Sequence, residues 1–217
     1  MIKSWSASRV FQFEECAAKL RYSAIDKLPE PEDPDGPLAR GKRIHAEGEH
    51  YLKAKRAPQM PASYRYLADE LRALRKGKAI SEEQWGFNSK WEPVSWWDAT
   101  IRMVIDAHRA SKASVLVVDF KSGKPRQKDE DQVGLYAVGA FARYPKIKHV
   151  VGQLLYTDLG SIIQLEFNEA EMIRERNTWE QRAHRMMNDT KLEPRPGYYC
   201  KWCWHRKSNG GPCPEDK

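Results

Sequence analysis

The sequence predicts an α/β fold in which helices flank a central mixed β-sheet. Residues 100–108 and 113–121 are rich in β-branched and apolar side chains, which is typical of neighbouring strands. Residues 122–125 (Ser-Gly-Lys-Pro) end the second strand, and residues 129–144 then follow helical spacing. We expect the sheet to extend from about Ile80 to Phe167.

Five further segments complete this prediction. Residues 37–56 begin with proline, which suits the first turn of a helix, and residues 64–74 place apolar side chains at helical spacing. Residues 150–156 and 162–167 predict two strands joined by a tight turn. The segment 168–189 starts like a capping box and predicts a long polar helix.

The composition indicates one soluble domain with a polyanionic partner. The 217 residues are 41% hydrophobic, enough for a full core, so we expect residues 1–217 to form a single domain. No apolar run approaches the roughly 18 residues that cross a membrane, and no export segment is evident. We therefore expect a cytoplasmic protein without a membrane partner. The net charge of +7 favours nucleic acid, although many unrelated proteins are basic.

Two carboxylates and a lysine mark the candidate catalytic site. The two-residue period of a strand puts Asp119 and Lys121 on one face, and Asp106 lies near the end of the preceding strand. Gln132 and Tyr136 are one helical turn apart on the next helix. Such carboxylates can hold Mg²⁺, and a nearby lysine can stabilise a developing oxyanion. Taken alone, Asp119 and Lys121 are more simply an exposed pair at a strand end.

A histidine upstream is a second candidate. Helical spacing puts Gly41, His45 and Gly48 on one face of the helix 37–56, which turns the histidine toward the core. A hydrogen-bonded core histidine is favoured over a metal ligand on this observation alone. The glycines predict close approach of another backbone. Glu82 and Glu83 could add a carboxylate to the site, but a solvated charge pair is favoured.

The four cysteines form the other constellation. Cys200 and Cys203 are followed by Cys213, and Cys16 is the remaining cysteine that could complete a four-ligand site. A reducing compartment disfavours disulfides, so the pattern indicates a bound metal. Zinc and an iron–sulfur cluster both accept four thiolates, and spacing does not separate them. His205 could replace one cysteine in a zinc site.

Five segments carry a resemblance to a known family, the PD-(D/E)XK nucleases, and within it to the RecB-like branch. They are SASRVFQFEECAAKLRY (6–22), GKRIH (41–45), VID (104–106), VVDFKSGK (117–124) and QVGLY (132–136). The resemblance implies a restriction-endonuclease-like core. Two positions depart from the family pattern: Met103 stands where a glycine is common, and Asp119 where many members have glutamate.

The resemblance implies roles for the candidate residues. His45, Asp106, Asp119 and the Phe120 carbonyl would bind Mg²⁺ or Mn²⁺, and Lys121 would be the catalytic lysine. Gln132 and Tyr136 would support the site and contact DNA. AddB-type and CRISPR-adaptation nucleases of this branch hold a structural [4Fe–4S] cluster, and the matching residues here are Cys16, Cys200, Cys203 and Cys213. That cluster would join residues 1–25 to residues 194–217, with structural Zn²⁺ as the alternative.

The implied activity is a DNA nuclease, and by analogy an exonuclease that processes DNA ends in recombination, replication or repair. Lys124, Arg126 and Lys128 crowd the turn after residue 121, where we expect phosphate to pass. The expected setting is the cytoplasm of a bacterium or of a phage-infected cell, with a recombination protein or a second copy as further partner. The rival classes are a zinc-stabilised nucleic-acid-binding protein and an adaptor on a decayed nuclease fold.

Overall fold

The computed structural model describes residues 2–31 and 33–215. Contacts divide them into two compact units. The sheet unit comprises residues 33–177, and the cysteine unit comprises residues 2–31 and 178–215. The predicted bracket of residues 1–25 and 194–217 falls in the cysteine unit, except that residues 1, 216 and 217 lie outside the described residues. A single domain remains a prediction.

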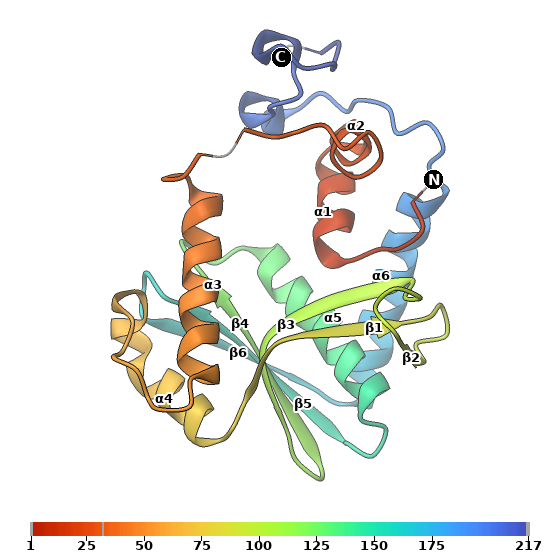
Figure 1. The fold of residues 1–217 in the computed structure, drawn as a ribbon. Coiled ribbons are helices and arrows are strands. Elements are labelled where there is room, and N and C mark those ends of the chain that lie inside the picture. Colours follow the sequence, from red (N-terminus) through yellow and green to blue (C-terminus); the bar gives the residue numbers. More distant parts are fainter. Residues whose placement is uncertain (1, 32, 216–217) are drawn as a thin grey trace. The chain divides into compact units, whose positions relative to one another are not determined.

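A six-stranded mixed sheet forms the centre of the sheet unit (Figure 1). The strand order is β2-β1-β3-β4-β5-β6, with β4 and β5 parallel and every other pair antiparallel. The bounds are β1 Ile80–Phe87, β2 Pro93–Val94, β3 Ile101–Ala110, β4 Ser114–Lys121, β5 His149–Tyr156 and β6 Ser161–Phe167. This confirms the predicted α/β class and the predicted extent of the sheet.

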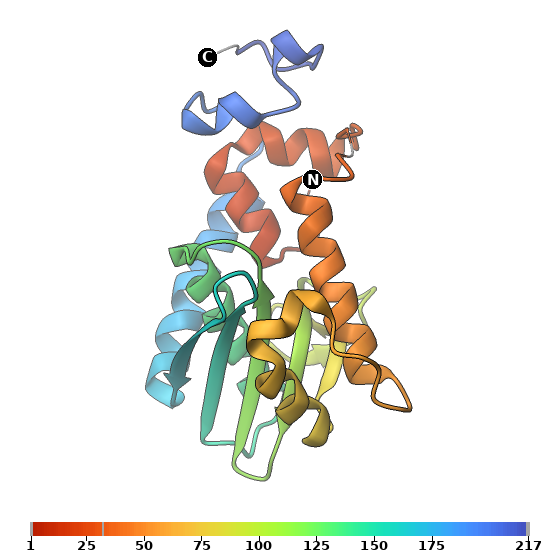
Figure 2. The ribbon, with the colours of Figure 1, turned by 90° about the vertical axis from the view of Figure 1, so that its left-hand side faces the viewer.

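Helices cover the sheet, and in Figure 2 α3 and α4 lie in front of it. Their bounds are α3 Pro37–Lys53, α4 Ala68–Lys76 and α5 Gln127–Arg143, with a short 3₁₀ helix at Ala62–Leu67 before α4. The α5 helix makes the crossover that parallel β4 and β5 require. One buried cluster joins α3 and α4 to the sheet: Ile44, Tyr51, Tyr64, Leu67, Leu71, Leu74, Ala107, Val118, Phe120 and Leu155.

Strand β3 does not alternate regularly to its end. Met103 faces α5, because a Cβ added to Gly139 would come within 2.7 Å of the Met103 sulfur. Ala107 instead packs in the cluster beneath α3, so odd-numbered residues change sides between these positions. Strict alternation along this strand would put the odd-numbered residues 101–107 on one face; β3 departs from that pattern beyond residue 105, and residues 105–108 are all buried.

The neighbouring strand carries a matching irregularity. Glu82 of β1 has φ of 50°, a left-handed conformation that is unusual for a residue with a side chain. It stands between the Ser81–Ala107 and Glu83–Ile105 pairs, which is the register position of Asp106. The irregular backbone thus lies where the two carboxylate side chains emerge.

The glycines of α3 have different surroundings. A Cβ on Gly48 would lie 2.4 Å from the Tyr64 hydroxyl and 2.9 Å from the Phe120 ring, so only glycine fits there. Gly41 has open space around it. The predicted close approach of a backbone is therefore wrong, because the close neighbours of Gly48 are side chains and Gly41 has none within 4 Å.

The cysteine unit consists of short helices and loops. Helix α1 (Ala7–Glu15) and the four-residue α2 (Ala17–Leu20) are followed by a π-helical turn at Arg21–Ile25. Helix α6 (Glu169–Asn188) enters this unit at residue 178 and brings Trp179 within 6.3 Å of the Trp5 ring centroid, nearly parallel to it. Short 3₁₀ helices follow at Tyr198–Trp202 and Lys207–Asn209. In the part of the chain that the structure describes, no helix is long and apolar enough to cross a membrane.

Candidate metal and catalytic site

Three ligand groups from separate elements of the sheet unit meet at one point. The Nδ1 atom of His45 on α3 lies 3.2 Å from Oδ1 of Asp106 on β3. It also lies 3.9 Å from Oε1 of Glu82 on β1. Each residue offers a ligand atom, and these atoms lie within 4.8 Å of one another. An imidazole and two carboxylates suit a divalent cation.

Asp106 also connects two strands. The β3–β4 ladder reaches the pair Ala107–Val118, and Asp106 lies just beyond it. Its Oδ2 accepts a 2.7 Å hydrogen bond from the buried backbone N–H of Phe120. The carboxylate is 5% exposed, and one oxygen fixes the neighbouring strand while the other faces His45.

Asp119 and Lys121 occupy the same space, as the strand period predicts. The Lys121 Nζ atom lies 2.6 Å from Oδ2 of Asp119 and donates a 3.0 Å hydrogen bond to Oε1 of Gln132 on α5. Gln132 in turn donates to the Tyr136 hydroxyl. Asp119 is 1% exposed, so the simpler alternative of an exposed pair is wrong. The helix pair positions the lysine.

Burial and nearby charges set the protonation of this cluster. Burial lowers the pKa of His45, but hydrogen bonds with Asp106 and Glu82 outweigh it and raise that pKa to about 10. Burial raises the pKa of Asp119, although the Lys121 cation opposes the rise. Burial lowers the pKa of Lys121, but Asp119 outweighs it and raises the net value, so the lysine stays charged at neutral pH.

Asp119 retains unused acceptor capacity. Among residues 2–31 and 33–215, no donor makes a well-directed hydrogen bond to either of its carboxylate oxygens, although Lys121 is close to one of them. Such buried acceptors are costly unless a charge compensates them. The Lys121 ammonium compensates Oδ2, and a metal cation at Oδ1 would satisfy the remaining acceptor, so the residues present fit a bound divalent metal.

Sequence reasoning missed two residues of this neighbourhood. Glu82 was expected in a solvated pair with Glu83; instead it faces His45, while Glu83 binds Arg143 at 2.7 Å. Asp129 is 3% exposed and lies 4.0 Å from the Lys121 ammonium. The left-handed backbone at Glu82 leaves no pattern in the sequence, whereas Asp129 stands in the first turn of α5, where a carboxylate is a recognised helix signal.

His45 is not a core histidine. Its side chain is 35% exposed and its ring meets the Phe120 ring edge-on at 6.3 Å. An open hollow adjoins it, lined by Pro37, Leu38, Gly41, Lys42, His45, Ala46, Glu49 and Glu82. A ligand can therefore reach the imidazole from solvent.

Asp158 binds the basic turn that follows β4. The Gly123 N–H donates 2.9 Å to Oδ2 of Asp158, which also pairs with the Arg40 guanidinium. Lys124 and Arg126 are exposed on this turn, and Lys128 is half-buried on α5. Their contact with DNA remains a prediction.

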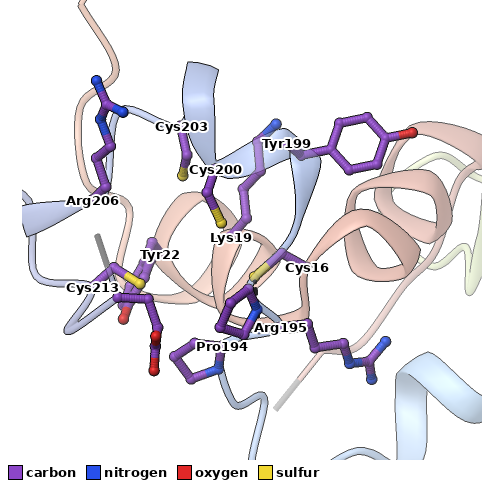
Figure 3. Close-up of a pocket in the computed structure, with 12 residues that line it drawn as sticks. Cys16, Lys19, Tyr22, Pro194, Arg195, Tyr199, Cys200, Cys203, Arg206 and Cys213 are labelled. Carbon is purple, nitrogen blue, oxygen red and sulfur yellow. Dashed lines mark hydrogen bonds between the residues drawn. The ribbon is translucent and has the colours of Figure 1, made fainter. Parts of the chain in front are cut away.

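The four cysteines line one cavity of the cysteine unit (Figure 3). All four are free thiols, and Cys213 is buried. The backbone N–H of Arg195 donates to Sγ of Cys16 at 3.4 Å, and that of Gly197 donates to Sγ of Cys200 at the same distance. Burial raises the pKa of the Cys203 thiol, and Cys16 and Cys213 raise it further.

Basic side chains and a histidine surround this cavity. Lys19, Arg195 and Arg206 line it. His205 is buried against the Tyr22 ring, and its Nε2 lies 3.2 Å from a carboxylate oxygen of Glu30. His205 is thus engaged by a carboxylate, and the four thiols remain the candidate ligand set.

A sequence profile of the PD-(D/E)XK nuclease superfamily matches residues 4–110 and 49–208. The chain belongs to this superfamily. A search of curated proteins finds none that matches the chain.

Two solved structures are similar to this superfamily member. One is a protein from Eubacterium rectale named "Putative exonuclease", with 12% sequence identity, a TM-score of 0.56, and coverage of 94% of this chain and 88% of that chain. The other is named SSO0001, with 15% identity, a TM-score of 0.43, and coverage of 93% and 83%. The first likeness supports the fold alone.

Proposed function

We propose that this PD-(D/E)XK nuclease superfamily member is a Mg²⁺- or Mn²⁺-dependent deoxyribonuclease. The observation that carries the proposal is the meeting of His45, Asp106 and Glu82 beside the buried Asp119–Lys121 pair. A non-enzymatic nucleic-acid-binding protein or an adaptor on a decayed fold gives no reason for this set to be complete.

His45, Asp106, Asp119 and the Phe120 carbonyl would hold the metal, and Glu82 would join them, because its carboxylate lies in one group with His45 and Asp106. When bound, the ion would polarise a water and offset charge on the scissile phosphate. Asp106 is positioned for this by the Phe120 N–H, which occupies its second oxygen. The pKa of His45 is raised, so metal binding must displace the proton that Asp106 and Glu82 favour.

Lys121 would act as a cation. Asp119 and Gln132 fix its ammonium, and its raised pKa keeps it protonated. A charged lysine cannot accept a proton, so its contribution is to orient the attacking water and stabilise charge that develops on the phosphate. Gln132 and Tyr136 would support this orientation and contact DNA.

We further propose that the enzyme is an exonuclease that acts on DNA ends in recombination, replication or repair. The name of the Eubacterium rectale protein and the RecB-like motifs support this choice. Lys124, Arg126 and Lys128 would contact the DNA backbone, because they follow the catalytic strand and carry positive charge. The proposed setting is the cytoplasm, with a recombination protein or a second copy as partner.

We also propose that Cys16, Cys200, Cys203 and Cys213 hold a structural [4Fe–4S] cluster. The shared cavity and the two N–H donors to sulfur fit thiolate ligands, and Lys19, Arg195 and Arg206 suit an anionic group.

Digestion of linear and circular DNA tests the nuclease. Linear substrates labelled separately at the 5′ and 3′ ends, single- and double-stranded, are incubated with Mg²⁺, Mn²⁺ or chelator. We expect wild-type protein to degrade linear DNA only when Mg²⁺ or Mn²⁺ is present and to leave circular DNA intact. Asp119→Asn and Lys121→Ala should abolish cleavage while circular dichroism stays unchanged. Degradation at the wild-type rate by both variants would contradict the proposed site. Cleavage of circular DNA would contradict the proposed exonuclease activity.

Colour and metal content test the cluster. Protein prepared without oxygen should be brown, absorb broadly near about 400 nm and contain iron. A colourless sample that contains zinc would contradict the cluster and support the zinc alternative.

A further inference from the structure

The C-terminal segment exposes an unusual concentration of aromatic rings. Within residues 198–204, Tyr198, Tyr199, Trp202 and Trp204 are 67%, 53%, 61% and 46% exposed. We call these four side chains the aromatic platform. Scattered apolar residues on a surface are normal, but large rings gathered in one short segment indicate a binding surface.

Three of the four rings contact one another rather than standing as isolated side chains. The Tyr198 and Trp202 ring centroids are 4.7 Å apart and the planes meet at 71°. Tyr199 lies 6.2 Å from Tyr198 at the same angle. These three rings meet at steep angles rather than stacked face to face, and each remains more than half exposed, so their surfaces stay accessible to a ligand.

The segment that carries the platform is basic, with Glu193 and Glu215 just outside its two ends. Residues 194–214 contain four Lys or Arg residues and no Asp or Glu. The Lys201 ammonium lies 5.3 Å from the Tyr198 ring centroid, which places a cation at the rings themselves. Aromatic faces combined with cations are the features that bind single-stranded nucleic acid, because bases stack on the rings while the cations meet phosphates.

We infer that the aromatic platform binds single-stranded DNA by base stacking. The inference rests on the proposed function for its choice of DNA as the nucleic acid. Trp202 stands between Cys200 and Cys203, so a group held by these thiols would also fix the backbone that carries the ring. The platform thus gives the substrate a second contact, with single-stranded segments as the preferred ligand.

Binding of a fluorescent oligothymidylate to the intact protein, prepared without oxygen and with chelator to stop cleavage, tests the inference. We expect Tyr198→Ala and Trp202→Ala each to weaken binding by about tenfold, and Trp202→Phe to retain most affinity. Trp97→Ala is the matched control, since Trp97 is 84% exposed on the sheet unit and should not matter. Absorbance near about 400 nm verifies that each variant keeps its cluster.

An abasic oligomer of equal charge separates stacking from electrostatics. Wild-type protein should bind it weakly, with no further loss in the ring variants. Equal affinity for both oligomers, or unchanged affinity in both alanine variants, would overturn the platform. Self-association that Trp202→Ala abolishes, together with ring-independent DNA binding, would overturn it in favour of a protein interface.

Cleavage of linear duplex DNA by the same samples, with metal restored, keeps the two proposals apart. DNA binding that depends on the rings, without cleavage, would contradict the proposed nuclease activity and support DNA binding by the aromatic platform. Cleavage with ring-independent binding would overturn the platform and leave the nuclease.

Discussion

The two units hold their reactive side chains in different ways. In the sheet unit, hydrogen bonds between neighbouring elements hold the site: Asp106 on β3 accepts from the Phe120 N–H on β4, and Lys121 on β4 donates to Gln132 on α5. In the cysteine unit, the thiols stand on short 3₁₀ helices, loops and a helix break around a cavity. A site held by hydrogen bonds between strands and a helix of the sheet unit should survive loss of its metal, whereas a site made of loops should depend on what it binds.

Loss of the cluster should therefore have the largest effect on stability. Cys213→Ser should remove absorbance near about 400 nm and destabilise the cysteine unit by on the order of 5 kcal/mol. Hydrogen exchange followed by mass spectrometry should show lost protection in residues 2–31 and 178–215, with residues 33–177 still protected. Lys207→Ala, an exposed change in the same unit, serves as control. Equal loss of protection in both units would contradict the claim that only the cysteine unit depends on its bound group.

In the sheet unit, the corresponding test concerns metal affinity, and Glu82 is the residue to change. Glu82→Gln removes one carboxylate beside His45, so we expect Mn²⁺ affinity to fall about tenfold and cleavage to slow, without loss of thermal stability. Isothermal titration with Mn²⁺ measures the affinity, and the exposed Glu92→Gln is the control. Unchanged affinity in Glu82→Gln would place this residue outside the metal site.

The contacts of Asp158 with the basic turn should contribute less to stability. Asp158→Asn weakens the link from the Gly123 N–H to Arg40, and because the pair is partly exposed we expect a loss of about 1 kcal/mol or less. The pKa of Asp158 is lowered by Arg40, so this contribution is present above the unfolded pKa and is lost as pH falls through the folded pKa. Thermal melts should show a Tm difference between wild type and Asp158→Asn at neutral pH that shrinks at acid pH. A Tm difference that stays constant with pH would contradict this.

The smallest expected effect belongs to His108, which is fully buried with Nε2 3.0 Å from the Tyr144 hydroxyl. Burial lowers its pKa in the folded state. Below about pH 6.5 the unfolded chain binds the extra proton, so stability falls as pH decreases. The Tm gap between wild type and His108→Gln should narrow from pH 8 to pH 5.5, and a widening gap would contradict the assignment.

The sequence predicted the features that depend on a regular period. Strand β4 alternates between two faces, so Asp119 and Lys121 were correctly placed together, and the helix pair Gln132 and Tyr136 followed from 3.6-residue spacing. The long strands and helices were found with ends displaced by a few residues.

Features set by irregular backbone were not predictable. The left-handed φ of Glu82 and the side change in β3 bring Glu82 and Asp106 together, and neither follows from alternation. Gly48 was recognised as a close contact, but the neighbours that require glycine come from a distant helix and strand. The shared cysteine cavity depends equally on long-range folding, which spacing alone does not encode.

The most direct test of the catalytic claim compares two lysines of the sheet unit. Lys121→Met removes the buried ammonium held by Asp119, whereas Lys112→Met changes an exposed lysine in the turn between β3 and β4. Cleavage of end-labelled linear DNA with Mg²⁺ is measured for both, alongside Tm. We expect Lys121→Met to lose cleavage with its fold intact and Lys112→Met to cleave at the wild-type rate. Wild-type cleavage by Lys121→Met would contradict the proposed site.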